Sequence, residues 1–212
     1  LKIGSAPVRQ RSTSTLPMRV SGISMVFQDA QTSLDPVYTV RDQFADVLRG
    51  AGVEKAAIEQ EMRDRLAEVG LRDADRVLKA RPSELSGGMC QRVMLALAMA
   101  SRPEILIADE PTSALDAELA LEVMELLKRM TTEMGVTLLV ISHDIALCRH
   151  FCERVIVMLD GAIVDDCASR EAGSAERHPY TRALVESVPD LTMASWDRLP
   201  TIAPRVLEQI DA

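Results

Sequence analysis

The stretch Ile105–Pro111 reads Ile-Leu-Ile-Ala-Asp-Glu-Pro. Its four aliphatic residues have the length and composition of a strand that is buried on both faces of a sheet. Two carboxylates, Asp109 and Glu110, follow at once, and open α/β sheets bind their ligands at this end of their strands. One carboxylate can hold Mg²⁺ through water, and the other can polarise an attacking water. Taken alone, the pair could also be a solvated strand end.

A second informative stretch, Leu85–Arg92, reads Leu-Ser-Gly-Gly-Met-Cys-Gln-Arg and opens an apolar helix predicted over Met89–Ala100. Ser86 is a favoured helix cap. Gly87 and Gly88 let a phosphate approach the backbone closely, and a helix N-terminus attracts anions. The stretch therefore predicts a phosphate-binding helix start, with an ordinary capped helix as the alternative.

Two further polar residues follow apolar strands in the sequence. Gln28 comes after the predicted strand Ile23–Phe27, and its amide could reach a metal or the attacking water. His143 comes after Val136–Ile141, a second predicted buried strand, and a histidine there can hydrogen-bond a γ-phosphate. A lone glutamine or histidine at a strand end is more often structural, so neither residue decides a function by itself.

The order of elements predicts an α/β domain with a largely parallel sheet, because strands and helices alternate along the chain. Residues 36–102 interrupt this alternation and are expected to form an inserted helical subdomain, helical over about 40–71 and ended near Gly70. The other predicted elements are an amphipathic helix at Ala117–Met134 with the apolar stripe Leu121, Met124, Leu127 and Met130, a short helix at Asp144–Phe151, and a hairpin of Val155–Leu159 and Ala162–Val164 around Asp160-Gly161.

Composition narrows the class of protein. A hydrophobic content of 47% is enough for a core, which must be aliphatic because aromatic residues make up only 3%. The net charge of −8 argues against a large nucleic-acid-binding surface, which needs clustered Lys and Arg. No apolar run approaches the length of a membrane span. Cys90, Cys148, Cys152 and Cys167 lack CxxC spacing and are expected to be reduced thiols.

Together, these motifs occur in an order that resembles the nucleotide-binding domain of ABC transporters over about residues 20–190. Gln28 is similar to the Q-loop, and Leu85–Arg92 to the signature motif. Ile105–Glu110 is similar to Walker B with its catalytic glutamate, Ser113–Asp116 to the D-loop, and His143 to the switch histidine. The resemblance implies a P-loop NTPase-like ABC ATPase fold with an inserted helical subdomain.

A finer resemblance points to the peptide, nickel and metallophore importers. It rests on Phe27–Asp29 with Ser33–Pro36, on Met89 in the signature motif, and on the tail segment His178–Leu184. The peptide branch often carries a Cys-rich tail, and no cysteine follows Cys167, which favours a nickel or metallophore solute.

The resemblance also implies a mechanism. ATP and Mg²⁺ would be held between two such subunits, with Ser86, Gly87, Gly88, Gln91 and Asp116 binding nucleotide. Asp109 would hold Mg²⁺ with help from Gln28. Glu110 would be the general base or water orienter, His143 would stabilise the γ-phosphate, and Gln28 would assist catalysis. Expected partners are a second ABC ATPase subunit in a homo- or heterodimer, permease subunits that contact the Q-loop and helical subdomain, and, indirectly, an extracytoplasmic solute-binding protein, but no nucleic acid. The resemblance therefore implies a peripheral position on the cytoplasmic face of the inner membrane.

One family motif is missing from the sequence: no Walker A loop of the form GxxxxGK[ST] occurs in the 212 residues. We therefore expect an incomplete ATPase core at 1–35 and 103–170 that lacks the Walker A strand and helix, a helical subdomain at 36–102, and a C-terminal tail at 171–212. The chain is expected to be inactive alone. The alternatives are a degenerate cassette that acts as a non-catalytic interaction module, and a soluble ABC ATPase without a transport function.

Overall fold

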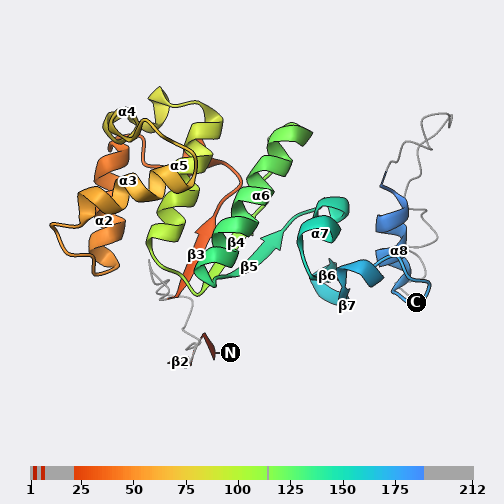
Figure 1. The fold of residues 1–212 in the computed structure, drawn as a ribbon. Helices are drawn as coiled ribbons and strands as arrows, with labels where there is room; N and C mark the ends of the chain where they lie inside the picture. Colours follow the sequence, from red (N-terminus) through yellow and green to blue (C-terminus); the bar gives the residue numbers. More distant parts are fainter. Residues whose placement is uncertain (1, 4–5, 8–21, 114, 189–212) are drawn as a thin grey trace. The chain divides into compact units, whose positions relative to one another are not determined.

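The computed structural model describes residues 2–3, 6–7, 22–113 and 115–188 (Figure 1). The chain forms two compact units, Leu1–Ile141 and Ser142–Ala212, which are described separately. This boundary was not among those expected from the sequence, and the expected helical subdomain lies wholly within the first unit. Near the start of the chain, the short strands β1 (Lys2–Ile3) and β2 (Ala6–Pro7) pair antiparallel.

The first unit is built on a three-stranded parallel sheet in the order β3-β4-β5. Its strands are β3 (Ile23–Val26), β4 (Ile105–Asp109) and β5 (Thr137–Ile141). The register pairs Val26 with Ala108, and Ala108 with Val140, so the carboxyl ends of the three strands lie level. The sequence prediction of a parallel sheet is therefore confirmed, and the residues that follow β3 and β4 are gathered at one edge.

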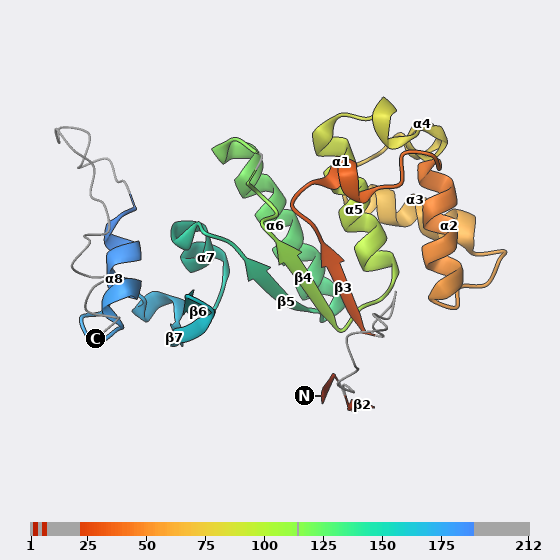
Figure 2. The same ribbon diagram turned by 180° about the vertical axis from the view of Figure 1, so that it is seen from behind.

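Only one face of this sheet is well buried. Leu106 and Ala108 are fully buried on the face that α5 and α6 cover. On the other face Ile107 is half-buried, and Leu139 and Ile141 are each 46% exposed. Figure 2 shows this face, where no described helix crosses the strands. The prediction of strands buried on both faces is wrong for the described residues, because they supply a helical layer on one side only.

The helical segment between β3 and β4 forms its own aliphatic core. Its helices are α1 (Ala30–Ser33), α2 (Val40–Gly50), α3 (Ile58–Glu68), α4 (Ala74–Lys79), a 3-10 turn at Pro82–Glu84, and α5 (Gly87–Ala100). Phe44, Leu48 and Leu66 are completely buried at its centre. The helical pattern predicted over 40–71 divides into α2 and α3, and Gly70 follows α3 with a φ of +80°, as expected for a helix terminator.

Helix α6 (Ala117–Met134) follows β4 and covers the sheet. Asp116 caps its start by accepting from the amide of Leu119 at 3.0 Å, and Gly135 ends it in the left-handed conformation. Three of the four residues of the predicted apolar stripe are buried, but Leu121 is 48% exposed. Ala120 and Val123 are buried on this part of the helix instead, so the buried face of α6 includes these two residues and leaves Leu121 outside it.

The second unit contains a hairpin flanked by helices. Its elements are α7 (Ile145–Phe151), β6 (Arg154–Leu159), β7 (Ala162–Ala168), a 3-10 turn at Ser169–Glu171, and α8 (Pro179–Glu186). Asp160 and Gly161 both have positive φ, at 48° and 82°, as a tight two-residue hairpin turn requires. The hairpin and its turn are confirmed, and both strands are longer than predicted.

Asp165 on β7 joins the tail segment to this hairpin. Its carboxylate accepts from the main-chain NH of His178 at 3.0 Å and pairs with Arg177 at 3.5 Å. Burial alone would raise the pKa of Asp165, but the hydrogen bonds from the main-chain NH groups of His178 and Asp166, together with the Arg177 guanidinium, outweigh it and lower that pKa. The carboxylate therefore serves as the anion at the start of α8.

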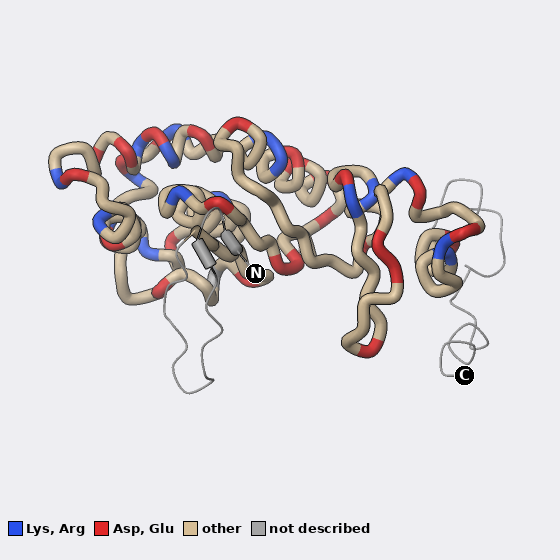
Figure 3. Tube along the Cα trace, turned by 90° about the horizontal axis from the view of Figure 1, so that it is seen from below, with Lys and Arg blue, Asp and Glu red and all other residues tan. Residues whose placement is uncertain are grey.

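Acidic and basic residues are interspersed along the chain (Figure 3). On α3, Arg63 pairs with Glu59 at 3.1 Å and with Asp75 at 2.6 Å, while Arg65 pairs with Glu61 at 2.8 Å. These pairs neutralise much of the charge on this helix. Among the described residues, no helix is both long enough and apolar enough to cross a membrane.

Candidate functional site

The candidate site begins at the carboxyl edge of the sheet. Gln28 is the second residue after the end of β3 and is exposed. Asp109 is the last residue of the adjacent strand β4 and is half-buried. Because the register pairs Val26 with Ala108, Gln28 and Glu110 come after the same level of the ladder. The structure therefore brings an amide and two carboxylates to one edge of the sheet, as the sequence predicted.

Glu110 has an unusual backbone conformation for a residue with a side chain. Its φ is +47°, in the left-handed region that L-residues other than glycine, asparagine and aspartate seldom adopt. The main-chain NH of Glu110 donates to the carbonyl of Ile141 at 2.9 Å, and its own carbonyl accepts from the Ser113 hydroxyl at 3.2 Å. These contacts impose the conformation from both sides. Backbone strain of this kind concentrates at functional sites.

The N-terminus of α5 offers main-chain amides to the solvent. The Ser86 hydroxyl accepts from the amide of Met89 at 3.3 Å and so caps the helix. Gly87 and Gly88 are exposed, and their amides belong to the first turn, where a helix supplies no carbonyl partners. The first turn carries no acidic residue that would compete with an anion. The predicted cap and the open glycines are both present.

A side chain of α5 contacts the segment that follows the paired carboxylates. The Gln91 amide nitrogen donates a hydrogen bond to the main-chain carbonyl of Pro111. Gln91 is half-buried and lies five positions after Ser86, and Pro111 directly follows Glu110. The two motifs that the sequence singled out are thus joined by one hydrogen bond, so the open end of α5 and the strained turn after β4 belong to one local structure.

The other predicted site residues are placed less centrally. Asp116 is exposed and its described role is to cap α6. His143 is exposed and belongs to the second unit, directly before Asp144, which caps α7 by accepting from Leu147 at 3.0 Å. His143 therefore lies in the second unit, whereas Glu110 lies in the first.

The structure also gives roles to residues that the sequence left without one. The carbonyl of Pro111 is the acceptor for Gln91, and Arg92, the last residue of the second quoted stretch, contacts two other helices. Pro111 gave no usable signal, because any residue could supply that carbonyl. Arg92 had a signal in its place within the motif, but its partners lie far away in sequence.

Chemically, the edge combines an anion-binding helix start with oxygen donors. Carboxylate and amide oxygens suit a hard divalent cation, and open amides suit a phosphate. Among the described residues, no cluster of three or more His, Cys, Asp or Glu has the geometry of a protein-only metal site. The donors present fit a cation that is shared with a phosphate ligand.

Comparison with known proteins gives consistent matches. Residues 2–113 match the family model described as ABC transporter. The chain is 41% identical to a probable peptide ABC transporter ATP-binding protein, y4tR, of Sinorhizobium fredii, over 87% of this chain and 56% of that protein. It is 42% identical to the dipeptide transport ATP-binding protein DppD of Haemophilus influenzae, over 79% of this chain and 51% of that protein. The chain thus spans about half the length of these curated relatives.

A solved structure confirms the fold. The structure of cbiO1 from Clostridium perfringens, described as part of the ABC transporter complex cbiONQ, matches with a TM-score of 0.63 and 25% identity. The match covers 91% of this chain and 68% of that one. The predicted α/β fold of the ABC ATPase type is therefore confirmed.

Proposed function

The chain belongs to the ABC transporter family, and on that premise we propose that it is the ATP-binding and ATP-hydrolysing subunit of a multi-subunit importer. The observation that carries this proposal is the contact, in the first unit, between the carboxyl edge of the sheet and the N-terminal turn of α5. There, the carboxylates Asp109 and Glu110 follow β4, and the Gln91–Pro111 hydrogen bond links them to the open amides of α5.

In this proposal the γ-phosphate of ATP is bound by main-chain amides and not by a cluster of Lys and Arg side chains. Ser86, Gly87 and Gly88 bind the γ-phosphate of an ATP molecule that a second ATPase subunit holds, in a head-to-tail pair. Gln91 and Asp116 border the same nucleotide. The support is the exposed, capped and acid-free first turn of α5, whose positive pole faces the anion.

The reacting water is assigned to Glu110. This carboxylate acts as the general base or orients the water, Gln28 assists it, and His143 stabilises the γ-phosphate charge in the transition state. Phosphoryl transfer needs little covalent chemistry from the protein, so positioning and electrostatics carry the rate. The constrained backbone of Glu110 supports this role, because it fixes where the carboxylate starts.

Mg²⁺ fits the donors at this edge. Asp109 would hold the ion through water and Gln28 would contribute its amide oxygen, and both are oxygen donors of the kind that Mg²⁺ prefers. When bound, the ion neutralises charge on the β- and γ-phosphates. Asp109 is half-buried at the strand end, where its carboxylate is held by the sheet rather than by a loop.

We assign the contact with the membrane partners to the exposed apolar residues on either side of Gln28 in the sequence. Phe27, Val37 and Tyr38 are 49%, 70% and 55% exposed, which is a large apolar exposure for a chain so poor in aromatic residues. Exposed apolar surface of this kind is typical of interaction sites. We assign them to the permease subunits, which places the chain peripherally at the cytoplasmic face of the membrane.

The solute is proposed to be of the peptide type. Both curated relatives described above are named for peptide or dipeptide transport. These names favour a peptide over the nickel or metallophore solute that the absence of a cysteine after Cys167 favours.

The 212-residue chain by itself is proposed to be inactive. Its sequence contains no GxxxxGK[ST] loop, so the β- and γ-phosphates lack the nest of amides and the lysine that hold them in P-loop proteins. Two alternatives remain: a non-catalytic module that lends only Ser86–Gly88 to a partner, and a soluble ABC ATPase unconnected with transport.

The deciding experiment is reconstitution in liposomes. A version of the chain that is completed with a Walker A loop is assembled with permease and partner ATPase subunits, and ATP hydrolysis and peptide uptake are measured without a further change and with Glu110→Gln. The proposal expects both activities to fall with the variant. Unchanged hydrolysis would favour the non-catalytic module, and hydrolysis that proceeds without permease or peptide would favour the soluble ATPase.

A further inference from the structure

The C-terminal end of α3 receives arginine side chains from two other helices. Arg92 on α5 donates from Nη1 to the carbonyl of Val69 at 2.8 Å, and Arg129 on α6 donates from Nη2 to the carbonyl of Glu68 at 3.3 Å. Arg92 also reaches Glu122 on α6, where its Nη2 lies 3.2 Å from Oε2. We call this group the α3 clasp: the carbonyls of Glu68 and Val69 with Arg92, Arg129 and Glu122.

The acceptors of the clasp are suited to cations. The last carbonyls of a helix have no partner within the helix and form its negative pole. Gly70 turns the chain away immediately after them with a φ of +80°. A Cβ at Gly70 would lie 3.2 Å from Nη1 of Arg92, so this position needs a glycine both for its backbone and for the room that the guanidinium takes.

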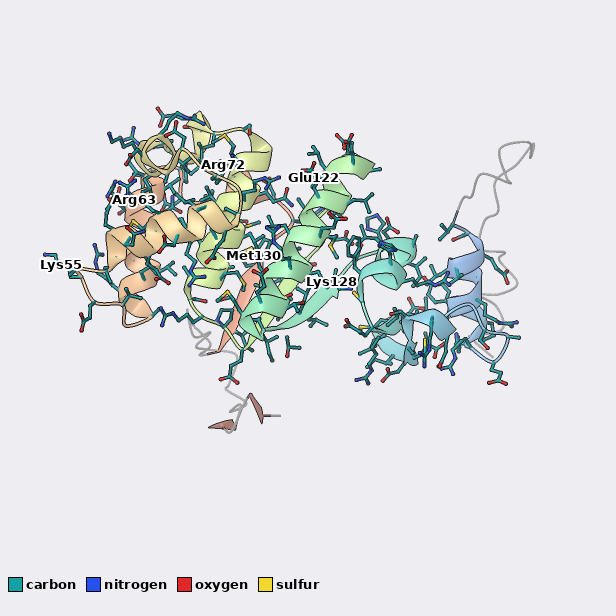
Figure 4. The ribbon with its side chains drawn as sticks, viewed as in Figure 1. Lys55, Arg63, Arg72, Glu122, Lys128 and Met130 are labelled. Atoms are coloured by element: carbon teal, nitrogen blue, oxygen red, sulfur yellow. The ribbon has the colours of Figure 1, made fainter. Side chains whose placement is uncertain are left out.

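Polar contacts matter at this junction because apolar packing is interrupted there. A cavity of 360 Å³ lies between α3 and α6, lined by Glu68, Arg129, Met130, Glu133 and Met134. Glu122 and Met130 are labelled on α6 in Figure 4. The clasp therefore bridges helices whose separation is not fixed by close-packed side chains alone.

The clasp connects the two halves of the candidate site. Helix α5 begins at the open amides of Ser86–Gly88, and α6 follows the segment that carries Asp109 and Glu110. Because the Arg92 guanidinium forks between α3 and α6, it limits how α5 can rotate against α6. Gln91, the residue before Arg92, also restrains α5, because its hydrogen bond to Pro111 ties the helix to the segment that leads into α6.

We propose that Arg92 is a positioning residue, which sets the orientation of the open end of α5 relative to Asp109 and Glu110 through the α3 clasp. This inference rests on the proposed function. Arg92 contacts neither nucleotide nor reacting water in this scheme. Its loss should therefore lower the turnover number and leave nucleotide affinity nearly unchanged, because ATP is held mainly by the partner subunit.

The test uses the assembled transporter with Arg92→Ala, Arg92→Lys and the control Arg102→Ala. Arg102 is exposed, with one ion pair to Glu61 at 3.4 Å. A second matched pair is Gly70→Ala and Gly52→Ala: both glycines have φ near +80°, but a Cβ at Gly52 meets no atom within 4 Å. The readouts are kcat and KM for ATP, and the distance distribution between spin labels introduced at Asp64 on α3 and Glu125 on α6.

Arg92→Ala should lower kcat roughly tenfold or more, as small misplacements of a reacting group do, with KM within about twofold. It should also broaden the spin-label distances. Arg92→Lys should fall between alanine and wild type, because lysine reaches one partner but cannot fork to two. Gly70→Ala should lower kcat by more than Gly52→Ala does, and by less than Arg92→Ala does.

Three results would overturn the proposal: kcat equal to that of Arg102→Ala, a loss confined to KM, or a loss of kcat with an unchanged distance distribution. If the wild-type assembly hydrolyses no ATP, the proposed function fails. The distances still decide whether the clasp orients the helices. If Arg92→Ala does not fold, Arg92→Lys and the glycine pair give the same answer.

Discussion

The main-chain NH of Glu110 is hydrogen-bonded to the carbonyl of Ile141 at 2.9 Å, one step beyond the last paired residues of β4 and β5. The contact prolongs the ladder just where Glu110 takes a positive φ. The turn that presents the acid is thereby fixed by the neighbouring strand as well as by the local contact with Ser113.

Glu110→Gln should abolish turnover without unfolding the chain. The amide keeps the size and backbone of the glutamate but cannot accept a proton. In a transporter assembled with a version of the chain that is completed with a Walker A loop, ATP hydrolysis should therefore fall by about 100-fold or more. ATP should remain bound in a closed pair of subunits, as measured by retention of radiolabelled nucleotide. Glu104→Gln, an exposed acid before the start of β4, is the control and should hydrolyse ATP normally.

Ser86→Asp and Ser86→Ala should separate capping from phosphate binding. Alanine removes the acceptor for the Met89 amide and should cost about 1 kcal/mol of unfolding free energy. Aspartate keeps the cap and suits the helix pole, so thermal stability should be retained. Its charge should nevertheless repel a phosphate and suppress hydrolysis. Equal activity of the aspartate variant and wild type would remove Ser86 from the phosphate site.

Gly88→Ala should stabilise the fold while harming activity. A Cβ at Gly88 meets no atom within 4 Å, and alanine is favoured over glycine in a helix by up to about 1 kcal/mol. The same methyl group projects into the space where a phosphate would approach the amides. We expect a higher melting temperature by calorimetry and a lower rate of ATP hydrolysis. A variant with unchanged hydrolysis would show that no ligand comes close to this backbone.

The isolated 212-residue chain should bind ATP·Mg²⁺ weakly. Without a lysine in a glycine-rich loop, the phosphates have lost their main charge partners, and the open amides of α5 act on nucleotide held elsewhere. Isothermal titration should show no binding in roughly the micromolar range. Mixing with a partner ATPase subunit provides the positive control. Micromolar binding by the chain alone would contradict the prediction.

Asp165 should make the stability of the second unit depend on pH. Its pKa in the folded chain lies below the value of about 3.9 in an unfolded chain, because hydrogen bonds to the carboxylate outweigh its burial. The stabilisation is therefore present above about pH 4 and is lost as pH falls through the folded-state pKa. In urea unfolding, the free energy of unfolding should fall less between pH 7 and pH 3 for Asp165→Asn than for wild type. Parallel curves for the two proteins would exclude this role.

Local sequence signals predicted much of the fold and the site. Ser86 as a helix cap, Gly70 as a terminator and the Asp160-Gly161 turn each depend on residues within a few positions of one another, and all three are confirmed. The strand before Asp109 was also recognisable, because a run of aliphatic residues ends abruptly in charge.

Relations across the fold were not predictable in this way. The exposure of Leu121 depends on which side of α6 meets the sheet, and helical periodicity gave a stripe without its exact orientation. The carbonyl of Ile141 is one of the two contacts that hold the positive φ of Glu110, and the role of Arg92 comes from Val69 and Glu122. No pattern in a single stretch encodes such partners.

The exposed face of the sheet has a consequence for how the chain is made in the cell. Helices α1–α5 must all leave the ribosome between β3 and β4, so the first strand waits for its parallel partner, and such long-range pairing forms slowly. Within the part of the chain that the structure describes, Leu139 and Ile141 are still exposed after it forms. A chain of this kind is an expected client of chaperones, and its soluble yield should rise when they are co-expressed.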